Sequence, residues 1–510
     1  MMSASRVDNS VKNVSYGLLL TAIGAIISFV NRTFFIKYLG PEYLGLNGLF
    51  TEVISVISLA ELGVGMAINY SLYRPIHDND TQRISQLMAL FRKTYNIICI
   101  AVLAIGLIVL PFVHLIVTET TYPISYIRLV FFLFLINTSV SYLFSYNTSY
   151  IGANQRQYVL SLISTIAKVV FSVIAILVLV ATRNYILFLI IIIVQTLTTN
   201  VVATLYVKRH FPFIDYSLSL SKEDRRSVFR DIKNIFIKRV SGVITSSTDN
   251  ILISALVSTV QVGYYSNYTL FFSLVRTLKL QFTSGIKASI GDLSVSESPE
   301  RCNLVLKRLT FMYYCLAIVI CSCLLMCSSD IISVWLGSEY VMAELVVMVA
   351  IFNLYLEIWS DPLWQYLEVS GLFKQDKNIA ILGSAVNLVV SLILGKIMGI
   401  VGIFLGTVCT QLIQLVLKTR LLFTRKFSLS TKSYYLIVGK CMVSFLLLLL
   451  VHYACAHFIT IGNLWISILV KGLIALLMSM VYITLMFFRT DEFSYSVQFV
   501  KSLLKKWRKS

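Results

Sequence analysis

Basic side chains occur inside long apolar stretches of this sequence, where a charge is costly. On membrane-insertion scales a charged side chain at the centre of a bilayer costs roughly 2.5 to 3.5 kcal/mol, so charges that persist usually face a cavity or an opposite charge. A guanidinium or ammonium group shielded from water binds phosphate oxygens strongly. Six cations in such stretches are therefore candidates for binding an anionic, phosphate-bearing ligand: Arg32, Lys168, Lys238, Arg239, Arg276 and Lys279.

Helical spacing places several of these cations on polar faces. Arg32 follows Ser28 by four residues, a step at which a helix returns to nearly the same side. Lys238 and Asp249 are eleven residues apart, a spacing that also places two side chains on one face of a helix. A basic stripe is formed by Arg276, Lys279, Thr283 and Lys287. The alternative to ligand binding is that Arg276 and Lys279 form structural ion pairs with Asp249 or with carboxylates of another apolar stretch.

Carboxylates form a second group of candidates. Asp361 and Glu368 follow Glu357 by four and eleven residues, which places all three on one face of a straight helix. Pro362 is expected to kink that helix and to free a backbone carbonyl one turn earlier. Such a face could hold a proton or a sodium ion during ion-coupled transport. The alternative is that these carboxylates only neutralise neighbouring lysines and arginines.

Asp249 and Glu52 complete the set of candidate ion-coupling residues. Glu52 and Glu61 are nine residues apart, which is about 180° around a helix at 100° per residue. Both could therefore face one shared interior only if the helix between them bends.

Membrane-spanning helices are needed to position these charges. The chain has 510 residues, of which 57% are hydrophobic and only 13% charged, so a water-soluble core with a polar shell is excluded. A span needs roughly 20 apolar residues. We predict an all-α polytopic membrane protein with about fourteen transmembrane helices at 13–38, 44–71, 88–115, 125–150, 157–181, 184–207, 234–257, 262–288, 309–335, 341–369, 376–396, 400–423, 433–457 and 464–487.

Most basic residues outside the spans are predicted to lie on one side of the membrane. With alternating spans, only Lys37, Arg183 and Lys396 fall in loops on one side, and the other Lys and Arg residues of the loops fall on the opposite side. Basic loops face the cytoplasm, so this asymmetry predicts that both termini are cytoplasmic and that the number of spans is even. The net charge of +19 is thus explained by membrane orientation, and we expect no nucleic-acid partner.

These spans divide the chain into five parts. We predict an N-terminal lobe at 1–207, a cytoplasmic amphipathic linker at 208–233 and a second lobe at 234–424. Two further spans follow at 425–487, and a basic amphipathic cytoplasmic tail occupies 488–510. The linker and the tail combine apolar and basic residues, which is typical of helices that lie on anionic lipid headgroups.

Several chemistries are absent from the sequence. It contains no G-x-x-x-x-G-K-[ST] loop for ATP, and its nine cysteines and five histidines show no metal-ligand spacing. No Ser, His and Asp group is expected at one membrane depth. We therefore expect no enzyme activity, no metal site and no cofactor, and coupling to H⁺ or Na⁺ stays open.

Four segments carry a resemblance to a known family. They are residues 28–47 (SFVNRTFFIKYLGPEYLGLN), 61–65 (ELGVG), and 249–253 (DNILI) with 262–268 (VGYYSNY). They resemble the polysaccharide-transporter (Wzx-type) branch of the MOP flippase superfamily, whose fold lipid II flippases and MATE exporters share. The resemblance implies two pseudo-symmetric six-helix lobes around a central lumen, with two C-terminal helices appended. Because Glu61 belongs to the segment 61–65, which takes part in the resemblance, we expect a structural role for it.

The segments around Gly45 and Gly263 also echo each other at the start of each predicted lobe. Gly45 comes thirteen residues after Arg32, and Gly263 comes thirteen after Asn250. This echo favours an internal repeat, a common construction of secondary transporters.

The resemblance also implies a function. It indicates a flippase that moves an undecaprenyl-pyrophosphate-linked oligosaccharide repeat unit across the bacterial cytoplasmic membrane by alternating access, for capsule, O-antigen or exopolysaccharide synthesis. Membrane lipid and other glycan-assembly proteins are further expected partners. The alternatives are a cation-coupled MATE-like exporter of small amphiphilic molecules and a lipid II flippase.

Overall fold

The computed structural model describes residues 2–61, 64–154, 156–226, 228, 247–458 and 462–507. Within these residues the secondary structure is helical, with no β-strand. Two of the predicted cations, Lys238 and Arg239, lie outside the described residues. The chain divides into two compact units, Met1–Gly263 and Tyr264–Ser510.

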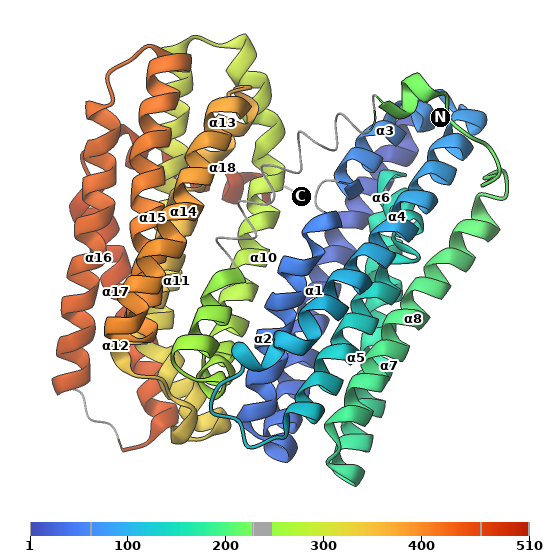
Figure 1. Ribbon diagram of the computed structural model, residues 1–510. Helices are drawn as coiled ribbons and strands as arrows, with labels where there is room; N and C mark the ends of the chain where they lie inside the picture. The colour runs from blue at the N-terminus through green and yellow to red at the C-terminus, as the bar shows by residue number, and fades with distance from the viewer. Residues whose placement is uncertain are drawn as a thin grey trace. The chain divides into compact units, whose positions relative to one another are not determined.

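The N-terminal unit is built mainly of long apolar helices, drawn in blue to green in Figure 1. Its elements are α1 (Met2–Leu39), α2 (Pro41–Ile57), the 3₁₀ turn η1 (Ser58–Glu61), α3 (Val64–Asp78), α4 (Thr81–Val109), the 3₁₀ turn η2 (Leu110–Leu115), α5 (Ile124–Tyr142), α6 (Ser145–Ala153), α7 (Gln157–Thr182) and α8 (Tyr185–His210). Residues 247–256 are also helical.

The long helix α10 (Thr259–Ser296) begins in the N-terminal unit and continues into the second unit. The second unit further contains α11 (Pro299–Leu336), the 3₁₀ turn η3 (Ser338–Tyr340), α12 (Glu344–Trp359), α13 (Asp361–Val369), α14 (Phe373–Met398), α15 (Ile400–Leu422), the π-helical turn η4 (Phe423–Phe427), α16 (Lys432–Phe458), α17 (Leu464–Phe487) and α18 (Asp491–Trp507).

Ten of the described helices are long and apolar enough to cross a membrane, and the bent pair α12 and α13 makes up to eleven. Three of the fourteen predicted spans have no counterpart among these eleven. The span at 44–71 is divided among α2, η1 and α3, the span at 234–257 lies largely outside the described residues, and the span at 262–288 belongs to α10. We attribute the absence of α10 from this set to its many polar and charged residues.

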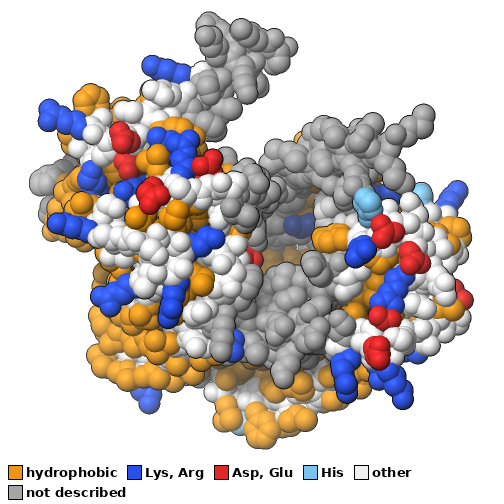
Figure 2. Space-filling view, turned by 90° about the horizontal axis from the view of Figure 1, so that it is seen from above, with side chains coloured by type: hydrophobic (Ala, Val, Ile, Leu, Met, Phe, Trp, Pro, Cys, Tyr) orange, Lys and Arg blue, Asp and Glu red, His pale blue; other side chains and the backbone are white. Residues whose placement is uncertain are grey.

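Exposed apolar side chains confirm that the chain is a multi-pass membrane protein. Figure 2, which looks onto one end of the helices, shows hydrophobic side chains on their flanks and many Lys and Arg side chains on the end itself. Ile97, Leu177, Leu446 and Leu485 are each at least 60% exposed. Such exposure is expected where lipid surrounds the helices, because lipid tails solvate apolar side chains.

Glycines allow the closest helix contacts in both units. A Cβ atom on Gly406 of α15 would overlap Ser391 of α14. A Cβ atom on Gly45 of α2 would overlap the carbonyl of Thr259, and one on Gly263 would overlap the carbonyl of Pro41 and lie 3.0 Å from the Gly45 nitrogen. The two glycines of the predicted repeat therefore meet at one crossing between α2 and the first turns of α10.

The predicted linker packs against the ends of α4 and α6. Ser85 of α4 donates to the Phe213 carbonyl at 3.2 Å, and Tyr216 donates to Asn147 of α6 at 3.0 Å. Arg83 of α4 pairs with Asp224 at 2.7 Å, and this hydrogen bond lowers the pKa of the Asp224 carboxyl to about 2. The described part of the linker, up to residue 226, is thus attached to the N-terminal unit.

Candidate functional site

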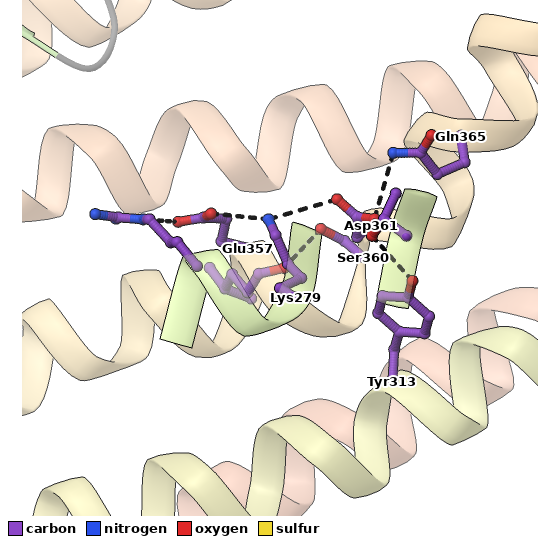
Figure 3. A network of polar contacts seen from close by, with 9 residues as sticks. Lys279, Tyr313, Glu357, Ser360, Asp361 and Gln365 are labelled. Carbon is purple, nitrogen blue, oxygen red and sulfur yellow. Dashed lines mark hydrogen bonds and ion pairs between the residues drawn. The ribbon is translucent and has the colours of Figure 1, made fainter. Parts of the chain in front are cut away.

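Four of the predicted charged residues lie together in the second unit. Arg276 Nε lies 2.9 Å from Glu357 Oε2, and Lys279 Nζ lies 2.8 Å from Glu357 Oε1. Lys279 Nζ also lies 3.4 Å from Asp361 Oδ1. Figure 3 shows Lys279 between the two carboxylates. Arg276 and Lys279 come from α10, Glu357 comes from α12, and Asp361 is the first residue of α13.

Neutral side chains hold the second oxygen of Asp361. Thr283 of α10 donates to Asp361 Oδ2 at 2.9 Å, and its hydroxyl is also 3.0 Å from the Tyr313 hydroxyl. Gln365 donates to the same carboxylate oxygen at 3.4 Å (Figure 3). The carboxylate of Asp361 therefore accepts hydrogen bonds from a side chain of α10 and from a side chain of its own helix, α13.

A break between two helices brings Glu357 and Asp361 to the same cations. α12 and α13 meet at an angle of 41°, and Pro362 is the second residue of α13. Proline cannot donate the backbone hydrogen bond that would continue α12, so the predicted kink is confirmed. At the break, the Leu356 carbonyl accepts hydrogen bonds from the Ser360 hydroxyl at 2.6 Å and from the Ser360 backbone N–H at 3.3 Å.

The two cations of this network differ in exposure. The side chain of Lys279 is only 10% exposed, whereas that of Arg276 is 47% exposed. Two cations and two carboxylates also make the group electrically neutral. The ion pairs that the sequence left as an alternative for Arg276 and Lys279 are therefore formed with the carboxylates of α12 and α13. A ligand can still reach Arg276, because about half of its side chain is exposed.

Two other predicted cations lie on neighbouring helices of the N-terminal unit. Lys168 of α7 donates to the Gly24 carbonyl at 2.9 Å and to the Ser28 hydroxyl at 2.7 Å, both on α1. Arg32 is half-buried and one turn farther along α1. Beside it, Asn31 donates to Ser172 of α7 at 2.7 Å. Within the part of the chain that the structure describes, no carboxylate pairs with Lys168.

Three carboxylate candidates remain: Glu52, Asp249 and Glu368. Glu52 is on α2 and Asp249 is in the helical segment 247–256, both in the N-terminal unit. Glu368 lies near the end of α13. All three are partly exposed.

Two buried ion pairs were not anticipated from the sequence. Lys471 of α17 lies 2.7 Å from Asp330 of α11, and Lys418 of α15 lies 3.1 Å from Asp376 of α14. Their side chains are 8% to 19% exposed. A charge within an apolar run signals that such a pair exists, but nothing in the sequence identifies its partner.

The chain matches a known protein family in sequence and known transporter structures in fold. Residues 10–278 match the family described as "Polysaccharide biosynthesis protein". No curated protein matches the chain. A structure of the lipid II flippase MurJ in an inward closed conformation has a TM-score of 0.68 and 14% identity, and the match covers 92% of this chain and 98% of that one.

Two transporter structures are also similar. An inward-facing multidrug resistance MATE family transporter of the MOP superfamily has a TM-score of 0.60 and 15% identity, over 77% of this chain and 92% of that one. The Vibrio cholerae MATE transporter VcmN has a TM-score of 0.56 and 15% identity, over 83% and 99%. At these identities the likeness shows the fold, and it confirms the MOP-type helical fold expected from the sequence.

Proposed function

The chain belongs to the polysaccharide biosynthesis protein family, and we propose that it is a flippase for an undecaprenyl-pyrophosphate-linked oligosaccharide repeat unit. In this proposal the headgroup crosses the bacterial cytoplasmic membrane by alternating access, while the polyprenyl tail remains in lipid. The product would serve capsule, O-antigen or exopolysaccharide synthesis. A hydrated passage lined by polar groups removes most of the cost of moving sugars through hydrocarbon.

One observation carries this proposal: the side chain of Arg276 is 47% exposed while it pairs with Glu357 of α12. A guanidinium can exchange the Glu357 carboxylate for a phosphate oxygen, because both ligands offer the same paired acceptors. Glu357 would keep its contact with Lys279 during the exchange, at 2.8 Å in the present geometry. No buried charge would then be left alone, which keeps the exchange inexpensive.

The N-terminal unit holds further cations whose chemistry suits an anionic headgroup. Lys168 uses two neutral oxygens of α1 as acceptors, and an ammonium group has three donors. Its third donor and its full positive charge suit a phosphate oxygen. We include Arg32, one turn along α1, in the same role, together with Lys238 and Arg239.

Coupling to an ion belongs to the same proposal. Protonation of Glu357 would weaken its hold on Arg276 and so favour phosphate binding. Within the network we expect a proton rather than Na⁺, because Lys279 already occupies the place between the two carboxylates. Asp249, Glu368 and Glu52 stay candidates for coupling to H⁺ or Na⁺ elsewhere.

The test uses cells that lack this gene but retain the glycan pathway. We expect a polyprenyl-pyrophosphate oligosaccharide to accumulate in extracted lipids, as seen by mass spectrometry, and the wild-type gene to restore the baseline. Arg276→Ala and Lys168→Met should leave at least tenfold more of this lipid at normal protein level, because losing one charge-assisted contact costs roughly 1.5 to 3 kcal/mol. Lys440→Met is the matched control, since Lys440 lies over the Phe487 ring within the appended helices.

The same spectrum separates the alternatives. Accumulation of lipid II instead of a glycan repeat unit would favour lipid II flipping, which the likeness to MurJ makes the second candidate. If neither lipid accumulates, the flippase proposal fails, and a drug-efflux assay then tests export of small amphiphilic molecules. Normal lipid levels with both Arg276→Ala and Lys168→Met would remove the phosphate contacts from the proposal.

A further inference from the structure

A short loop of the N-terminal unit is hydrogen-bonded to two helices that lie far from it in the sequence. The loop, residues 116–121, follows η2 and precedes α5, and we call it the strap. On one side it contacts the first turn of α2. On the other side it contacts residues 254–259, where the helical segment 247–256 ends and α10 begins.

Glu42 of α2 holds the strap with both of its carboxylate oxygens. The Thr120 hydroxyl donates to Glu42 Oε1 at 2.6 Å, and the Thr121 backbone N–H donates to the same oxygen at 2.8 Å. The Thr121 hydroxyl donates to Glu42 Oε2 at 2.8 Å. Hydrogen bonds to an ionised acceptor are roughly twice as strong as neutral ones, so this carboxylate is the main attachment of the strap to α2.

The opposite side of the strap is bonded to buried hydroxyl groups. Ser254 Oγ donates to the Ile116 carbonyl at 2.6 Å and lies 2.8 Å from Thr259 Oγ1. The Thr118 N–H donates to Thr259 Oγ1 at 3.1 Å, and the Thr259 N–H donates to the Thr118 carbonyl at 3.4 Å. The Thr118 hydroxyl donates to the Ser254 carbonyl. Ser254 and Thr259 have no exposed surface, so water cannot replace these partners.

The two sides of the strap therefore differ in how easily they can separate. Thr121 is exposed and Glu42 is half-buried, so water can take over the hydrogen bonds between them. The buried side would lose its partners without replacement. If the strap detaches from one helix, the contact with Glu42 is the one that breaks.

The strap joins α2 and α10 at the place where they pack most closely. A Cβ atom on Gly45 would overlap the carbonyl of Thr259, and one on Gly48 would lie 3.0 Å from Val262 Cγ1. Val262 has no exposed surface. While both sides of the strap are bonded, the first turns of α10 are held against α2.

We propose that the strap detaches from Glu42 before the first turns of α10 can move away from α2. The inference rests on the alternating access of the proposed function, in which the passage opens to the outside. The loop charges predict that this end of the N-terminal unit is external. Reattachment of Thr120 and Thr121 to Glu42 then closes the contact between α2 and α10 again.

The first test measures how fast a membrane-impermeant maleimide modifies Val262→Cys in intact cells that produce the full-length protein. Mass spectrometry of the peptide that contains residue 262 separates this site from the nine natural cysteines. With Glu42 present the modification should be slow. Glu42→Ala should speed it roughly tenfold or more, because all three bonds to a charged acceptor are lost, and Glu42→Gln should have a smaller effect.

Two controls separate detachment from general loosening. Glu119→Gln removes an exposed carboxylate of the strap that takes no part in the bonds to Glu42, and it should leave the rate at residue 262 unchanged. Cys99 is a natural buried cysteine on α4, and its modification should stay slow in Glu42→Ala. Equal acceleration at Cys99 and at residue 262 would show partial unfolding and overturn the proposal. Thr121→Val keeps the test valid if Glu42→Ala does not fold, since it removes one donor and changes no charge.

The second test joins the strap to α2 covalently. Glu42→Cys with Thr121→Cys, linked by a short bis-methanethiosulfonate reagent, should make the glycan lipid accumulate roughly tenfold, and a reducing agent should reverse this. Each single cysteine variant with the same reagent is the control. Unchanged lipid levels with the strap linked, or an unchanged rate at residue 262 in both Glu42→Ala and Thr121→Val, would overturn the proposal. Faster modification in Glu42→Ala, in a protein whose deletion accumulates no glycan lipid, would remove the flippase proposal and leave the strap in place.

Discussion

At the scale of single residues, Lys279 is the centre of the charged network in the second unit. Its ammonium group contacts both Glu357 and Asp361, and its side chain is only 10% exposed. Buried ion pairs add little stability compared with a well-packed apolar group, but removing one partner leaves an uncompensated charge. Lys279 therefore allows two acidic side chains to lie next to each other among membrane helices.

We predict that Lys279→Met lowers the thermal stability of the protein strongly. The substitution leaves Asp361 without its cation, and breaking a buried pair costs about 3 to 5 kcal/mol. Thermal unfolding of the purified protein measures the effect. The double variant Lys279→Met with Asp361→Leu should recover most of the loss, because no buried charge remains at that position. A double variant as unstable as the single one would contradict this account of Lys279.

At the scale of the elements, glycines decide how closely helices pack. Gly406 of α15 faces Ser391 of α14 so closely that a Cβ atom has no room. Small residues at such positions let helix backbones approach, and this packing stabilises helix pairs in lipid. Gly45 and Gly263 serve the same purpose where α2 meets the start of α10.

We predict that Gly406→Val destabilises the protein by about 1 to 3 kcal/mol, the usual cost of overpacking. A decrease in the unfolding temperature would show this effect. Gly439→Ala in α16 is the control, because a Cβ atom there meets nothing within 4 Å. The control should be neutral or slightly stabilising, since alanine favours a helix by up to about 1 kcal/mol over glycine. Equal effects of the two substitutions would contradict the packing argument.

At the scale of the whole molecule, loop charges predict how the chain sits in its membrane. The turn between α7 and α8 holds Arg183 and Asn184 as its two non-helical residues. The last turn of α8, where the predicted linker begins, contains Lys208, Arg209 and His210. From the positive-inside rule we therefore predict that the linker and both termini are cytoplasmic and that the Arg183 turn is external.

We predict that alkaline phosphatase is active when it is fused after Arg183 and inactive when it is fused to the C-terminus. The enzyme needs an oxidising compartment to form its disulfides, so its activity reports an external position. A fluorescent protein at the C-terminus should show the complementary result. Activity of the C-terminal phosphatase fusion would reverse the predicted orientation and with it the direction of transport.

The sequence by itself determined the helical membrane character, the location of charges within spans and the kink at Pro362. Each of these depends on local composition or on one residue's backbone chemistry. Only the tertiary structure decided which charges meet, as for Lys279 with Asp361 and for Asp330 with Lys471. Helical spacing gives the face on which a side chain lies, but the neighbour of that face depends on how distant helices pack. A polar cavity between α2, η1 and α5 was hidden for the same reason, because two helices and a 3₁₀ turn must pack together to enclose it.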